Sequence, residues 1–382
     1  MKLNIWVVIG IVIAVVAAVV LFMRGEKPQP VAPTAPPAPK AQPAPEAMPS
    51  GEVLRLLTWG GYAPEKVVEM FKAETGISVE VTNSNNEEMI SKLRATGGAG
   101  FDLAQPSQDR IAGAQMEFDI YKPIDLSQID ASQMIGSMLE GTKKNTTVDG
   151  KVYGVPHVWG TSALTVNINQ AAGVKDYLDL CDPQYAGKVS YRTKRPTLIA
   201  FAFALGLDPF AAYNDKAAYQ AILDKVEAKL IECKPNVKVY WSGGDALINL
   251  IRSDEVVAAM AWDGSGWKIN AEKPEVKTIA PTSGALGWID TFALPKKTKA
   301  EAAAYKWINF VMRPKIASMI AEAAGNFTAA KDGDKFVSEA KRQRYQDTFP
   351  PAAIDNIKWY PPVPAGLEDM EGKVLDRVQA AK

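Results

Sequence analysis

Residues 150–167 constrain the fold more than any other part of this chain, because they indicate one strand that is interrupted and then resumes. Residues 152–155 are typical of a short strand, and Pro156, which lacks a backbone donor, is not expected to continue it as an ordinary central strand. Trp159 follows beside a glycine, and residues 163–167 indicate a second β run. The pattern predicts a crossing between two lobes that hold a ligand between them.

The length and charge of the chain limit its possible functions. A chain of 382 residues is long for one domain and sufficient for two, and its 47% apolar content allows a sizeable core. The 43 basic and 43 acidic residues cancel, which argues against a nucleic-acid surface and a polybasic membrane patch. His157 is the single histidine, which excludes a metal cluster of several histidines but not a catalytic triad. We expect neither a metal site nor a cofactor.

The first 50 residues have two different compositions. Residues 5–23 form an apolar run without a charge, long enough to span a bilayer as a helix, and no small-residue cleavage site closes it. We therefore favour an uncleaved membrane anchor over residues 1–27; the alternative is a cleaved signal that releases the protein. Residues 28–50 are rich in Pro and Ala and predict an extended linker, so the folded body is expected to begin near Gly51.

The body begins with a βαβ pattern. Residues 53–58 indicate a buried strand, a helical stretch follows, and residues 77–81 indicate the next strand, which together predict a parallel sheet. Ligands of open α/β sheets bind at the carboxyl ends of the strands, and Trp59 and Tyr62 stand at the end of the first one. Both could be core aromatics, but the Gly-Gly pair between them favours a pocket wall.

Other predicted strands are also followed by polar and aromatic residues. Ser107 and Asp109 come after residues 101–104, where Ser107 can equally cap a helix. The second half of the body has further rings and carboxylates at or near strand ends, namely Trp241, Trp262, Asp263, Trp288 and Asp290. Ring faces and carboxylates together suit a small cation or an amine with a methylene chain. We predict that these residues and Trp159 form one binding site.

A basic loop precedes the apolar helix predicted over residues 198–205. Arg192, Lys194 and Arg195, with the amides at the start of that helix, could form an anion site. A solvated basic loop is the alternative interpretation.

The spacing of Cys181 and Cys233 fits no zinc or redox motif. In an oxidising compartment they are expected to form a disulfide that closes a long loop; the alternative is two buried free thiols. An enzyme that used one of them as its nucleophile would need that cysteine in the cleft. Neither cysteine lies at a strand end of the aromatic set, so we expect a binding protein and not an enzyme.

Six motifs occur in order along the body. They are LTWGGYAP at 57–64, FKAETGISV at 71–79, FDL at 101–103, YGVPHVWGT at 153–161, MAWDGS at 260–265 and WIDTFALP at 288–295. Together they resemble the periplasmic spermidine/putrescine-binding proteins of ABC importers. The resemblance implies an α/β, two-lobed, type II periplasmic binding protein, with lobe 1 formed by 51–153 and 289–325 and lobe 2 by 154–288 and 326–382. It also implies closure on a small solute and docking to ABC permease subunits in the membrane, and we expect a monomer in the periplasm.

Carried over position by position, the resemblance assigns ligand contacts to Trp59, Tyr62, Ser107, Trp262 and Asp290. One departure concerns the basic loop: polyamine binders have an acidic pair at the start of this helix, whereas this chain has Lys194 and Arg195. An ammonium that faced these cations would be strongly disfavoured. A polyamine is therefore the first hypothesis. The alternatives are a different amine, a zwitterion or an anionic small solute, or an anchored ligand sensor.

Overall fold

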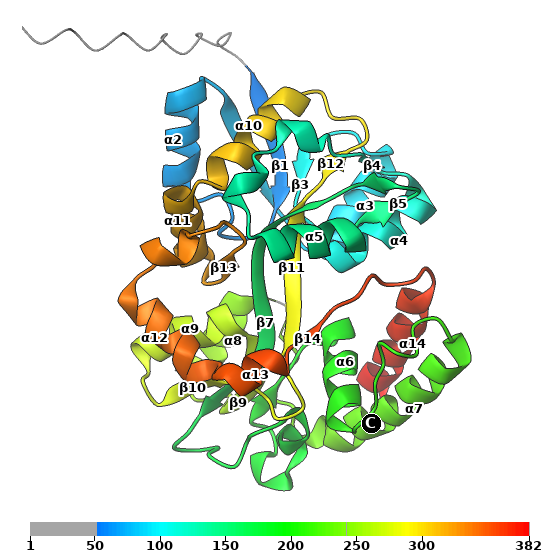
Figure 1. Cartoon of the computed structure of the whole chain (residues 1–382). Helices are drawn as coiled ribbons and strands as arrows, with labels where there is room; N and C mark the ends of the chain where they lie inside the picture. The colour runs from blue at the N-terminus through cyan, green and yellow to red at the C-terminus, as the bar shows by residue number, and fades with distance from the viewer. Residues whose placement is uncertain (1–51, 242, 382) are drawn as a thin grey trace, which may run out of the picture. The chain divides into compact units, whose positions relative to one another are not determined.

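The computed structural model describes residues 52–241 and 243–381 (Figure 1). The predicted anchor over residues 1–27 and the linker over 28–50 lie outside the described residues. Within the two described ranges, no helix has the length and apolar character that a membrane crossing requires.

The first sheet is parallel, as the βαβ pattern predicts. Its strand order is β2-β1-β3, from β1 (Val53–Thr58), β2 (Ser78–Asn83) and β3 (Leu103–Ala104). Helix α2 (Glu65–Thr75) connects the first two strands and buries Val67 and Phe71. It ends at Gly76, whose φ of 75° is the left-handed conformation that glycine adopts readily. Helix α3 (Asn86–Thr96) follows β2, so its first turn lies at the carboxyl end of the sheet.

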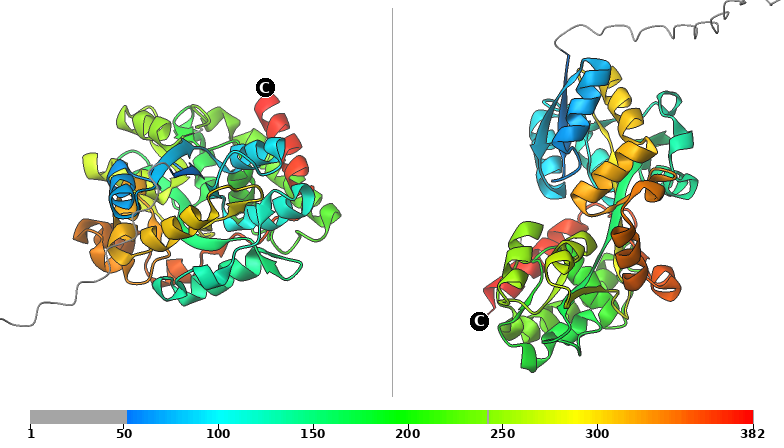
Figure 2. Two further views of the ribbon diagram at one scale, coloured as in Figure 1. Left: turned by 90° about the horizontal axis from the view of Figure 1, so that it is seen from above. Right: turned by 90° about the vertical axis from the view of Figure 1, so that its left-hand side faces the viewer.

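Two antiparallel strands connect the halves of the body. Strand β7 (Val155–Asn167) runs for 13 residues beside β11 (Leu286–Phe292). The right-hand view of Figure 2 shows β7, in green, passing from the upper group of elements to the lower one. The expectation that the strand stops at Pro156 is wrong, because the chain continues through it.

The proline is accommodated by an irregular register. Asp290 lies opposite Val158 and Thr291 lies opposite Pro156, so the pairing shifts around His157. The N–H of Thr291 donates to the carbonyl of Pro106 (2.9 Å). The missing donor of Pro156 is therefore located at a bulge, where the regular ladder is already broken.

The second sheet has the order β14-β11-β7-β9-β8, and β10 and β13 also pair with β7. Its other strands are β8 (Val189–Ser190), β9 (Ala258–Trp262), β10 (Val276–Ile279), β13 (Phe327–Thr328) and β14 (Lys358–Trp359). The helices of this half are α6 (Arg195–Ala204), α7 (Lys216–Cys233), α8 (Gly244–Arg252), α9 (Asp263–Glu272), α12 (Glu339–Thr348), α13 (Pro351–Asp355) and α14 (Leu367–Ala380). The remaining elements are α4 (Gln108–Phe118), β4 (Tyr121–Lys122), α5 (Gly136–Asn145), β5 (Thr147–Val148), β6 (Lys151–Val152), β12 (Leu294–Pro295), α10 (Glu301–Val311) and α11 (Pro314–Ala324).

Each half has its own large apolar core. The first core packs β1, α2, α10 and α11 around Trp307, whose ring meets that of Phe71 edge to face at 5.0 Å. The second core packs α6, α7 and α14 around Tyr177, Tyr219 and Phe201. We call the elements on these cores the first and second lobes. Ala329 and Ala330 belong to the first core, and the exact lobe boundaries remain a prediction.

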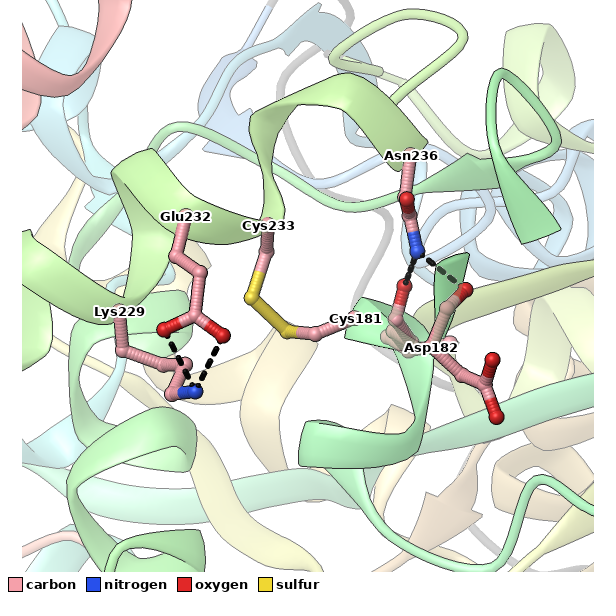
Figure 3. The surroundings of a disulfide bond; sticks show 7 residues. Cys181, Asp182, Lys229, Glu232, Cys233 and Asn236 are labelled. Atoms are coloured by element: carbon pink, nitrogen blue, oxygen red, sulfur yellow. Dashed lines mark hydrogen bonds and ion pairs between the residues drawn. A yellow bond between two sulfur atoms is a disulfide. The ribbon is translucent and has the colours of Figure 1, made fainter. Parts of the chain in front are cut away.

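Cys181 and Cys233 are joined by a disulfide in this structure (Figure 3). The bond connects the short 3-10 turn Tyr177–Cys181 with the last residue of α7. Asn236 fastens the same two segments, because its side-chain amide donates to the carbonyls of Leu180 (2.9 Å) and Asp182 (2.6 Å). The disulfide therefore reinforces the second core away from the strand ends.

Candidate functional site

A cavity of about 500 Å³ lies between the two lobes, and residues of both crossing strands are part of its lining. The first lobe contributes the segments after β1 and β2 and the start of α4, including Trp59, Tyr62, Asn86, Glu87, Ser107, Asp109 and Arg110. The second lobe contributes the starts of α6 and α8 and the end of β9, including Arg192, Lys194, Arg195, Gly244, Asp245 and Trp262. Trp288 and Asp290 come from the crossing strand β11. The cavity thus lies where the sequence predicts a cleft, at the ends of strands from both lobes.

Asp290 is a buried carboxylate with two hydroxyl donors. Ser107 donates to its Oδ1 and Tyr62 donates to its Oδ2, each at 2.5 Å. Asn86 in turn holds Ser107, because its amide donates to Ser107 Oγ (2.9 Å) and accepts from Ser107 N (2.9 Å). Burial raises the pKa of Asp290 to about 7, although the two hydroxyl hydrogen bonds act in the opposite direction. The site therefore holds a desolvated carboxyl group, and a cation bound beside it would stabilise its ionised form.

Three indole rings line the cavity. Trp59 is fixed by its Nε1–H, which donates to the carbonyl of Gln105 (2.8 Å). Its ring meets the ring of Trp262 from the second lobe edge to face, with the centroids 6.5 Å apart. Trp288 lies across Gly160, since a Cβ at that glycine would come within 2.6 Å of the indole. These rings offer apolar contact for methylenes and negative faces for a cation.

Trp241 does not line this cavity, contrary to expectation. It is buried, its Nε1–H donates to the carbonyl of Met260 (3.0 Å), and its ring packs edge-on against Trp262 at 5.0 Å. The guanidinium of Arg192 lies over both rings, 5.1 Å from Trp241 and 4.9 Å from Trp262. Trp241 therefore supports the two side chains that do reach the cavity.

Trp159 is also outside the cavity. Its ring stacks on Phe327 at 4.5 Å, and its Nε1–H donates to the carbonyl of Thr328 (3.2 Å). Trp159 is outside the cavity because successive side chains of a strand point to opposite faces of the sheet. Gly160 is opposite Trp288, and that face carries the cavity, whereas Trp159 is opposite Ile289 on the other face.

Asp263 is a structural carboxylate in this structure and is absent from the cavity wall. It is completely buried and accepts hydrogen bonds from Thr161 N (2.8 Å), Thr161 Oγ1 (3.1 Å) and Gly264 N (2.6 Å). Burial raises its pKa to about 7 despite these donors. It joins β7 to the start of α9, so the prediction of a ligand contact is not supported by its position.

Asp109 and Arg195 line the cavity but bind each other. Arg195 Nη1 lies 3.1 Å from Asp109 Oδ2, and Arg195 Nε lies 3.2 Å from Glu371 Oε1. The guanidinium also donates to the hydroxyl of Tyr213. Arg195 thus has two buried carboxylate partners, one from each lobe, whereas Lys194 is exposed at the cavity wall. Of the three predicted anion contacts, Arg195 is committed to this buried ion pair, whereas Arg192 and Lys194 have no ion-pair partner among the described residues.

His157 is a core residue next to the site. Its Nδ1 accepts a hydrogen bond from Gln105 Nε2 (2.8 Å), and its ring packs against Phe292 at 4.3 Å. Burial lowers its pKa to about 3, so the imidazole stays neutral. The triad alternative finds no support in this arrangement.

Several cavity residues were not predicted as ligand contacts. Glu87 and Asn86 open α3 at the carboxyl end of β2, so the strand-end rule could have identified them if applied to that strand. Arg192 was predicted as part of a possible anion site, but its contacts with two indoles at the cavity were not predicted. Asn326 follows α11 and could not be found from local sequence, because tertiary packing alone brings it beside Tyr62.

Known proteins resemble this chain in sequence and in fold. A profile described as "Bacterial extracellular solute-binding protein" matches residues 66–342. The spermidine/putrescine-binding periplasmic protein of Escherichia coli (strain K12) is 28% identical over 278 residues, which cover 71% of this chain and 76% of that protein. The putrescine-binding periplasmic protein PotF of the same strain is 24% identical over 322 residues, which cover 79% of this chain and 84% of PotF.

The fold has solved counterparts as well. The structure of a spermidine/putrescine ABC transporter substrate-binding protein, PotD, from Streptococcus pneumoniae matches with a TM-score of 0.70 at 21% sequence identity. The match covers 86% of this chain and 99% of that one.

Proposed function

Because the chain belongs to the family of bacterial extracellular solute-binding proteins, we propose that it is the receptor of an ABC importer and binds a small amine of the polyamine group. The observation that carries this proposal is the buried Asp290 in a cavity lined by three indole rings. An ammonium placed there would pair with the carboxylate, and the rings would contact the methylene chain. The names of the relatives from Escherichia coli support the same ligand class.

The mechanism is binding without chemistry. The predicted α/β fold of a type II periplasmic binding protein is confirmed for the body, and family membership confirms that the protein is a receptor and not an enzyme. In the proposal, each lobe supplies one wall of the cavity, as Trp59 and Trp262 do. A ligand then stabilises the closed state because only closure brings both sets of contacts together.

The setting of the receptor is part of the proposal. We place the body in the periplasm, where it delivers its solute to permease subunits in the membrane. Residues 1–27 would tether it and residues 28–50 would act as a spacer, unless the segment is a cleaved signal. The predicted lobe boundaries, 51–153 with 289–325 and 154–288 with 326–382, define the two bodies that would move.

Calorimetry combined with small-angle scattering tests the proposed function. Putrescine or spermidine should bind with one-to-one stoichiometry and reduce the radius of gyration, with the ligand recovered unchanged. At about a hundred times the dissociation constant, the ligand should stabilise the protein by about 2.7 kcal/mol. If no amine binds, or if binding leaves the shape unchanged at saturation, the proposal of a closing amine receptor is wrong.

A further inference from the structure

Four buried donors at the cavity have no hydrogen-bond partner among the described residues. They are Arg110 Nε, the hydroxyl of Tyr360, Arg192 Nε and Trp288 Nε1, and all four side chains line the cavity. Arg110 already has an ion-pair partner in Glu368 (2.8 Å), whereas no ion pair within the described part of the chain holds Arg192. A buried donor without an acceptor is unfavourable, and such groups in native proteins usually serve a ligand or a water. The donors therefore indicate that a bound solute presents acceptor groups to this cavity.

The positive charge on the second-lobe wall of the cavity also favours an acceptor group on the solute. The guanidinium of Arg192 is held over two indole rings, and Lys194 lies two residues further along the same loop. Within the described ranges, no carboxylate lies within ion-pair distance of either cation. Glu87 is the acidic group whose field reaches both, but it also interacts with Arg110. Arg110 has a closer partner in Glu368 (2.8 Å), so Glu87 is left opposite Arg192 and Lys194. Two cations against one carboxylate leave an excess of positive charge at this part of the wall.

Backbone amides add to the positive potential. Helix α6 begins at Arg195 and α8 begins at Gly244, and both starting segments line the cavity. Neither helix has a side chain that caps its first turn. The first amides of α6 therefore contribute partial positive charge beside Arg192, whereas those of α8 are offset by Asp245 in its first turn.

The other end of the cavity, at Asp290, is acidic. This carboxyl group is buried on β11 and receives hydroxyl donors only from the first lobe, Ser107 and Tyr62. A diamine bound there would direct its second ammonium into a cavity whose other wall holds Arg192 and Lys194. Like charges in a desolvated site are strongly unfavourable, so the second end of the solute needs a different chemistry.

We infer that the solute is an ω-amino acid, whose ammonium binds Asp290 and whose carboxylate binds Arg192 and Trp288. This inference rests on the proposed function, since Asp290 must hold an ammonium. It keeps the ammonium end of the proposed amine and replaces the second ammonium of a diamine by a carboxylate, because a carboxylate matches the planar guanidinium and also accepts from the indole N–H.

The first experiment compares ligands that differ at one end only. Putrescine and 5-aminovalerate both have four methylenes, and cadaverine and 6-aminohexanoate both have five. By calorimetry at pH 8, each amino acid should bind at least tenfold more tightly than its matching diamine. If the diamines bind more tightly, the inference is overturned and the proposed function survives. If no compound of either series binds, both fail.

A second experiment changes the protein. Arg192→Gln should weaken the binding of the preferred amino acid at least tenfold and leave the matching diamine unchanged or tighter. Arg252→Gln is the matched control, because Arg252 is an exposed arginine of the second lobe that pairs with Glu272 away from this cavity. Arg192→Lys, which keeps the charge, should retain more of the affinity than Arg192→Gln if the folded state is intact by circular dichroism. Equal losses for amino acid and diamine in Arg192→Gln would overturn the inference.

Discussion

Trp59 and Trp262 belong to opposite lobes and meet edge to face across the cavity, with ring centroids 6.5 Å apart. Because the two rings belong to different lobes, their contact requires the lobes to lie close together. The distance between the rings therefore reports how far the cavity is closed.

Removal of an indole from the wall should weaken ligand binding. Trp59→Ala is expected to lower the affinity roughly tenfold, or about 1.4 kcal/mol, because the ligand loses one ring face and the contact between the lobes. Trp159→Ala is the matched control, since that ring stacks on Phe327 outside the cavity. It should reduce the melting temperature and leave the affinity within about threefold. Full affinity in Trp59→Ala would exclude this wall as a contact.

The affinity for an amine should depend on pH through Asp290. Its pKa of about 7 means that the free protein holds a proton there in mild acid. Because an ammonium pairs with the ionised form, binding must displace that proton, and affinity should fall about tenfold for each pH unit below 7. Above pH 8 it should be constant. In Asp290→Asn the affinity should be low and insensitive to pH between 5 and 8; the same slope as in the unaltered protein would assign the titration to another group.

Gly160 should be intolerant of a side chain because Trp288 lies across it. A Cβ there would approach the indole to 2.6 Å, so Gly160→Ala should displace Trp288 and weaken ligand binding. Gly141→Ala is the control: Gly141 is exposed within α5, and an added Cβ meets nothing within 4 Å. That change should stabilise the protein by about 0.5–1 kcal/mol, because alanine favours a helix. Equal behaviour of the two variants in calorimetry would contradict the packing described here.

The disulfide should contribute to stability and not to binding. Unfolded protein without reductant should show no free thiol towards a thiol reagent, whereas two free thiols would mean that the bond does not form. Cys181→Ser with Cys233→Ser should lower the free energy of unfolding by about 4 kcal/mol, the chain-entropy value for a sequence separation of 52 residues. Ligand affinity of the folded double variant should be unchanged, because the bond lies in the second core.

Much of the fold could be predicted from local pattern. The βαβ order of residues 53–81 follows from alternating strand and helix signals, and the rule for strand ends brings Trp59, Tyr62 and Ser107 to the cavity. Pro156 was misread as the end of a strand. A bulge depends on the partner strand, and residues near position 156 contain no sign of the register that β11 adopts.

The amino-acid sequence by itself determined the strands and helices, the supply of indoles and carboxylates at their ends, and the resemblance to solute-binding proteins. The tertiary structure alone decided which of those side chains share the cavity. Register placed Trp288 on the cavity face and Trp159 on the other, and a buried pairing committed Asp109 to Arg195. Local composition specifies which groups a segment offers, whereas the partner of a side chain is set by segments distant in the chain.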